Sequence, residues 1–72
     1  MTADLCVAMG EASGLLTLLS NLGLTMSEAL ELANDEIREM MLPVAILIWE
    51  SEDLVPSEVA AEVTRLCLNA RS

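Results

Sequence analysis

The segment Leu22-Gly-Leu-Thr-Met-Ser-Glu28 of this 72-residue chain is expected to end one helix and to begin the next. Gly23 suits the left-handed backbone position that follows a helix end. Thr25 and Glu28 are expected to form a capping box, in which the Thr25 hydroxyl accepts from the Glu28 N–H and the Glu28 carboxylate accepts from the Thr25 N–H. The stretch therefore predicts a helical hairpin.

On its N-terminal side, residues 2–22 are expected to form a helix that Thr2 caps, with Asp4 in the first turn. A strand over Ala3–Met9 followed by a helix from Glu11 is the alternative. Leucines and alanines at spacings of three and four predict an apolar stripe. The opposite side of the helix holds small or uncharged residues, so another backbone could approach closely there. The stripe contains Leu5, Ala8, Ala12, Leu15, Leu19 and Leu22, widened by Leu16 and Leu18, and the small side contains Gly10, Ser13, Gly14, Thr17 and Asn21.

On its C-terminal side, residues 26–42 are expected to form an amphipathic helix whose apolar face carries the core. Leu30→Asp and Ile37→Asp are each predicted to unfold the domain, because both residues belong to this face. Four carboxylates lie nearly opposite the apolar face. They are expected to form either a solvated surface or a docking surface for a basic partner. The apolar face holds Met26, Leu30, Ala33, Ile37 and Met40, and the acidic face holds Glu28, Glu31, Asp35 and Glu39.

Pro43 should kink or break this helix, and a restarted helix is expected over residues 44–51, with a buried strand over 44–49 as the alternative. After an acidic connector, Pro56 predicts the start of a last helix over 56–70. We expect one all-α domain over residues 1–72, a small bundle of three to four helices built on the hairpin. The last helix should turn Val59, Val63, Leu66 and Ala70 inward beside Cys67, with Ala61, Thr64 and Leu68 on its far side and Arg65 and Arg71 towards its end.

Hydrophobic residues make up 54% of the chain, which is more than so small a domain can bury. The excess predicts either a homodimer or a partner protein that covers it. The apolar residues expected at such an interface are Leu15, Leu18, Leu22, Trp49 and Leu68. Trp49 is expected to be either an interface anchor or a core residue between helices.

The net charge of −9 comes from twelve acidic residues against three arginines, without lysine or histidine. Binding to a phosphate backbone requires basic side chains, so direct nucleic-acid binding is not expected. Anionic membrane surfaces should also repel the chain. A protein with a basic surface is the predicted partner.

The sequence offers little for catalysis, because it has no His, Lys or Tyr to titrate near neutral pH. Two distant cysteines do not form a zinc site. We therefore expect neither an enzyme nor a cofactor or metal.

The compartment is predicted to be the cytosol, because no basic region precedes an apolar stretch at the N-terminus. The longest nearly uninterrupted apolar run, Met40 to Trp49, is about half the length of a membrane span. In the cytosol Cys6 and Cys67 are expected to be reduced thiols, although they could pair if the termini meet.

The segment Leu22–Ala33, with Leu42-Pro43 further on, resembles the helical part of ribbon-helix-helix antitoxins of the RelB/DinJ type. The resemblance implies a dimeric helical core that masks a toxin. That family also has a basic N-terminal strand for DNA, and Ala3–Met9 carries no basic residue. The leading hypothesis is a small acidic protein that inhibits or modulates a larger protein, such as a phage-type inhibitor, an anti-defence protein or an antitoxin-like regulator. The alternative is a structural homodimer or assembly subunit.

Overall fold

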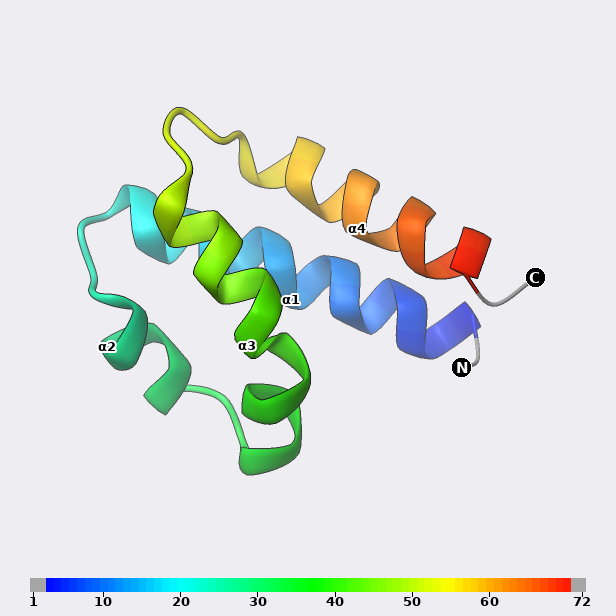
Figure 1. Ribbon diagram of the computed structural model, residues 1–72, viewed down its shortest axis with the longest axis horizontal. Helices are drawn as coiled ribbons and strands as arrows, with labels where there is room; N and C mark the ends of the chain where they lie inside the picture. The colour runs from blue at the N-terminus through cyan, green and yellow to red at the C-terminus, as the bar shows by residue number, and fades with distance from the viewer. Residues whose placement is uncertain (1–2, 71–72) are drawn as a thin grey trace.

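A computed structural model describes residues 3–70, which form four helices and no strand. The helices are α1 (Ala3–Asn21), α2 (Met26–Glu31), α3 (Asp35–Glu50) and α4 (Pro56–Ala70). Helix α1 contacts each of the other three, and α4 lies alongside it so that the start of α1 is beside the end of α4 (Figure 1). The all-helical prediction is confirmed, and the strand alternatives are wrong. The predicted roles of Thr2 and Arg71 lie outside the described residues, and dimerisation stays a prediction.

The predicted turn between α1 and α2 is confirmed in detail. Gly23 has a φ of 96°, and the Leu24 N–H donates to the Leu19 carbonyl at 3.2 Å, closing a Schellman motif. The Glu28 N–H donates to the Thr25 hydroxyl at 3.2 Å, while the Thr25 N–H donates to Glu28 Oε1 at 2.9 Å. Both halves of the capping box are therefore formed.

The predicted single helix over residues 26–42 is wrong, because one helix ends at Glu31 and the next begins at Asp35. Asn34 takes an extended conformation and its side chain accepts from the Ile37 N–H at 2.9 Å, which starts a new helix. Arg38 then reaches back and donates to the carbonyls of Leu30 and Ala33, each at 3.0 Å. The Arg38 bonds add to the backbone bond that the Ala33 N–H donates to the Leu30 carbonyl at 3.1 Å, and they help to satisfy the carbonyls at the end of α2.

The predicted break at Pro43 is also wrong, because α3 runs through this residue without interruption. The proline ring removes one hydrogen bond, to the carbonyl of Glu39. Both Pro43 and Glu39 are exposed, so water can reach that carbonyl. The cost of the missing bond is thus reduced, and the apolar spacing through Met41, Ala45 and Ile48 keeps one helix face on the core.

The small side of α1 is the side that the protein buries most completely. An added Cβ on Gly10 would lie 1.8 Å from Thr64 Oγ1 and 2.7 Å from the Ala60 carbonyl oxygen. One turn further, Gly14 lies against Pro56 and Ala60 in the same way. The expected close approach of a second backbone is confirmed, and α4 supplies it.

The leucine stripe of α1 is buried only in part. Leu16 is buried in the core and Leu19 packs against it, whereas Leu5, Leu15, Leu18 and Leu22 are exposed. The reason is that α4 occupies the glycine side of α1, which turns much of the stripe outward. The buried core lies between α1, α2 and α3 and consists of Leu16, Ala29, Leu30, Met41, Ala45 and Ile48.

We predict that Gly10→Ala lowers the free energy of unfolding by about 2 kcal/mol, since overpacking a tight contact outweighs the better helix propensity of alanine. Chemical denaturation would measure this change. Thr64→Ala in the same chain removes the nearest clashing atom and should restore part of the loss. A Gly10→Ala variant more stable than the original would contradict the close packing.

Cys6 and Cys67 form a disulfide with a Cα–Cα distance of 5.4 Å, so the expectation of two reduced thiols is wrong. That expectation followed from the predicted compartment and not from the chain itself. The antiparallel packing of α1 and α4 brings the start of α1 beside the end of α4 (Figure 1), which is the geometric condition for pairing. The bond ties the start of α1 to the last turns of α4.

Candidate functional site

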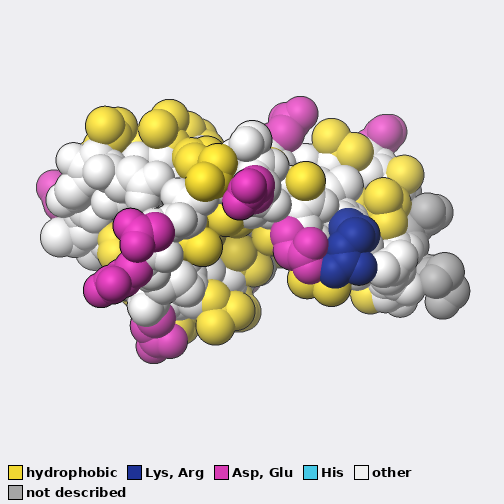
Figure 2. Space-filling view, turned by 90° about the horizontal axis from the view of Figure 1, so that it is seen from above, with side chains coloured by type: hydrophobic (Ala, Val, Ile, Leu, Met, Phe, Trp, Pro, Cys, Tyr) yellow, Lys and Arg dark blue, Asp and Glu magenta, His cyan; other side chains and the backbone are white. Residues whose placement is uncertain are grey.

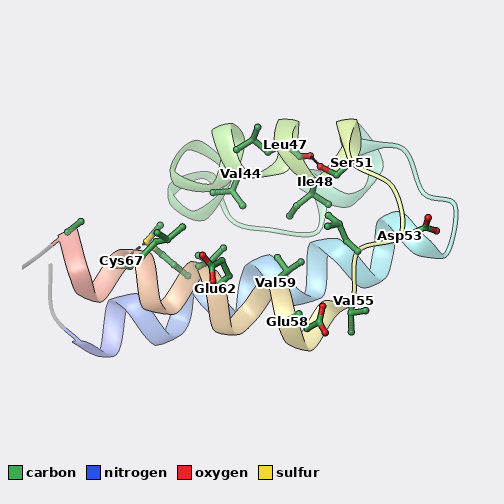
Figure 3. Close-up of a pocket in the computed structure, with 15 residues that line it drawn as sticks. Val44, Leu47, Ile48, Ser51, Asp53, Val55, Glu58, Val59, Glu62 and Cys67 are labelled. Carbon is green, nitrogen blue, oxygen red and sulfur yellow. Dashed lines mark hydrogen bonds between the residues drawn. The ribbon is translucent and has the colours of Figure 1, made fainter.

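An apolar groove lies between α3 and α4. Both helices pack against α1, but their backbones do not approach each other closely. The space left between them has a volume of about 860 Å³. In Figure 3, Val44 and Ile48 point from α3 towards α4, and Val59 points back from α4. We refer to this feature as the α3–α4 groove.

The groove is lined mostly by aliphatic side chains. Helix α3 supplies one wall, and α4 with the connector before it supplies the other. Met9 of α1 and the disulfide sulfur of Cys67 lie between the walls. The aliphatic lining residues of the two walls are Val44, Leu47, Ile48, Leu54, Val55, Val59, Val63, Leu66 and Ala70.

The charged residues that line the groove are all carboxylates: Asp53, Glu58 and Glu62. Glu62 is paired with Arg65, whose Nε donates to Glu62 Oε2 at 3.2 Å. This hydrogen bond lowers the pKa of Glu62 and raises that of Arg65. Figure 2 shows apolar patches interrupted by carboxylates, with a basic patch directly against an acidic one. An occupant of the groove would thus meet aliphatic walls and an acidic rim.

The sequence did not predict this groove. Val59, Val63, Leu66 and Ala70 were expected to face the core, and Thr64 to lie on the far side. Instead, the Ala60 and Thr64 side of α4 meets α1, while Leu66 is 53% exposed. The prediction holds for Val59, which packs against the core, and is wrong for Leu66, because Gly10 and Gly14 accept only small side chains on the inner side of α4. Those two glycines were the signal that could have shown the correct face.

The four predicted acidic residues do not form a single helix face. Glu28 and Glu31 belong to α2, while Asp35 and Glu39 belong to α3, and all four are exposed. Glu28 is engaged in the capping box, where the Thr25 N–H and then the Thr25 hydroxyl lower its pKa. Asp35 accepts from Arg38 at 3.3 Å. The continuous acidic stripe is therefore wrong, and Glu31 and Glu39 are two exposed carboxylates on separate helices.

The five predicted apolar interface residues are placed in two environments. Leu15, Leu18 and Leu22 are exposed on α1. Leu15 also borders a hollow of about 200 Å³ between α1, α2 and α3. Trp49 is half-buried against the core, and its Nε1 donates to the Leu24 carbonyl at 3.0 Å. Of the two roles considered for Trp49, the structure favours that of a core residue, and Leu68 is half-buried on α4.

Within residues 3–70, no group of three or more His, Cys, Asp or Glu side chains is placed to hold a metal ion. The absence of a cofactor and of catalysis stays a prediction.

Among the described helices, α1 is long and apolar enough to cross a membrane by length and composition alone. The expectation that no segment reaches this length is therefore wrong. A core helix passes the same test, and α1 is the helix against which the other three pack.

Comparison of the chain with protein-family models, with curated proteins and with solved structures found no match. The resemblance to ribbon-helix-helix antitoxins does not extend to their strand, because Ala3–Met9 is the start of α1. What the two share is the helix-capping turn at Thr25–Glu28.

Proposed function

We propose that this chain is a non-enzymatic protein-interaction domain that binds and modulates a larger protein with a basic surface. The observation that carries the proposal is the α3–α4 groove, which leaves aliphatic side chains uncovered beside carboxylates. Large uncovered apolar surfaces on small proteins are characteristic of binding sites. Inhibition of the partner, as by a phage-type inhibitor or an antitoxin-like regulator, is the form of modulation that we propose.

The net charge of −9 supports a basic partner, because opposite potentials accelerate encounter and set the binding register. It also supports the proposal that neither nucleic acid nor an anionic membrane is the target. The excess of acidic groups spread over α2, α3 and the connector provides this potential without requiring a single stripe.

The second candidate is a homodimer or assembly subunit. The exposed leucines of α1 and the hollow beside Leu15 favour it, because they are a second apolar surface outside the groove. Sedimentation at micromolar concentration separates the two candidates. A monomer would exclude the dimer, and a dimer dissociated by Leu15→Gln would assign this surface to self-association.

The cytosol is the proposed compartment, and the disulfide is the observation against it, because disulfides persist mainly in oxidising compartments. Alkylation of free thiols at the moment of cell lysis would decide the question. Modified Cys6 and Cys67 would support the cytosol, and an unmodified pair would exclude it.

We predict that Glu31→Lys with Glu39→Lys leaves the fold intact and weakens binding of the partner captured from the source cells at least threefold. Both side chains are exposed, and each reversal turns an attraction into a repulsion. Asp35 is a poorer choice, because its carboxylate lies in the first turn of α3 and pairs with Arg38.

The measurement is the dissociation constant for that purified partner at low and high salt. Salt should weaken binding and reduce the difference between variant and original. Glu11→Gln, an exposed position on α1, is the control for a small loss of charge. Binding that neither salt nor the reversals change would contradict a basic partner.

A further inference from the structure

We propose that the α3–α4 groove binds one amphipathic helix of the partner protein, with its apolar side in the groove and Lys or Arg beside it. This inference rests on the proposed function and specifies the element of the partner that is recognised. It is carried by the length of the groove, by the polarity of its lining and by the charges on its rim.

The groove is elongated along α4. Its lining residues on this side run from Val55 to Ala70 at spacings of three and four, which is one face of the helix. At a rise of 1.5 Å per residue, this face is about 22 Å long. An amphipathic helix of about four turns has the same length and presents anchors at matching intervals.

The lining leaves few groups for hydrogen bonding to an occupant. The Ser51 hydroxyl already donates to the Leu47 carbonyl at 2.8 Å, and Glu62 is held by Arg65. A segment that enters such a groove must satisfy its own backbone N–H and C=O groups. A helix does so internally, whereas an extended peptide would need an open strand edge, and residues 3–70 contain no strand.

The rim determines the charge of the occupant. Asp53, Glu58 and Glu62 flank the aliphatic walls, and Arg65 is paired with one of them. A second copy of this chain would bring another net charge of −9 to this rim. A helix with Lys or Arg next to its apolar side complements the rim, so we assign the groove to a different protein.

The first experiment measures binding of a fluorescein-labelled helical peptide of about 15 residues, with leucines every three or four positions and lysines beside them. Fluorescence anisotropy with the full chain is expected to show saturable binding. Two peptides serve as controls: one has the same composition in an order that destroys the apolar stripe, and one has glutamate in place of each lysine. Each should bind at least tenfold more weakly.

The second experiment places the peptide in the groove. Leu66→Gln should weaken peptide binding about tenfold, because a leucine that is 53% exposed in the free protein would be covered. Leu18→Gln is the matched control, since Leu18 is 45% exposed on α1 outside the groove. Glu58→Gln should weaken binding two- to fivefold at low salt and less at high salt. Circular dichroism would verify that each variant is folded.

Three results would overturn the proposal: equal binding of the striped and reordered peptides, equal effects of Leu66→Gln and Leu18→Gln, or a dimer of the chain that Leu66→Gln dissociates. The proposed function fails separately. If the chain captures a partner that the striped peptide does not displace, protein binding stands and the helix in the groove is wrong. If the striped peptide binds as described but no partner is captured from the source cells, the proposed function is wrong.

Discussion

Reduction of the Cys6–Cys67 disulfide is expected to lower the free energy of unfolding by about 4 kcal/mol. The two cysteines are 61 positions apart, so the bond closes nearly the whole chain and restricts the unfolded state accordingly. The core of a domain of this size supplies only about 3–5 kcal/mol without such a link. We expect the midpoint of thermal unfolding to fall by roughly 20 °C in the presence of a reductant.

The control is the double variant Cys6→Ala with Cys67→Ala. It should unfold at about the temperature of the reduced protein, and the reductant should not change it further. Differential scanning calorimetry, with thiol labelling to verify reduction, provides the measurement. A reduced protein whose free thiols are demonstrated but whose unfolding midpoint is unchanged would show that the helices hold the fold without the bond.

Leu30→Asp is the second large effect that we expect, a loss of at least about 4 kcal/mol that leaves the domain unfolded. Leu30 is 7% exposed and lies in the cluster between α1, α2 and α3. The guanidinium of Arg38 is already engaged there, because it donates to the carbonyls of Leu30 and Ala33 and to the Asp35 carboxylate. Far-ultraviolet circular dichroism would detect the loss of helix.

Ile37→Asp is the matched comparison for Leu30→Asp, and the structure predicts a smaller effect for it than the sequence did. Ile37 is 36% exposed in the first turn of α3, where the helix dipole favours an added carboxylate. We expect a loss of about 1 kcal/mol and a folded protein. Equal unfolding of the two variants would contradict the break of the helix at Asn34.

The candidate site was less predictable than the fold. The exposure of Leu15, Leu18 and Leu22 was compatible with the sequence, because a small acidic chain with so many leucines cannot bury them all. The groove was not predictable, since its two walls belong to helices whose backbones do not approach each other closely. The groove depends on how α3 and α4 each pack against α1. No residue spacing within one helix predicts that arrangement.

The local features of this protein could be predicted from its residues alone. The helical composition, the Gly23 turn, the Thr25–Glu28 capping box and the start of α4 at Pro56 all follow from interactions within a few residues. The charge of −9 is a property of composition and needs no structure. These features were predictable because the interacting groups are neighbours in the chain.

Which side of each helix is covered depends on the packing of the helices against one another. Gly10 and Gly14 allow α4 to approach α1 so closely that the glycine side is buried and leucines of α1 are turned outward. That packing places Cys6 beside Cys67 and opens the groove between α3 and α4. The larger apolar side chains could have faced either the interior or the solvent. Two helix backbones can approach each other most closely only where a Cβ is missing, and so the glycines fix which side of α1 is buried.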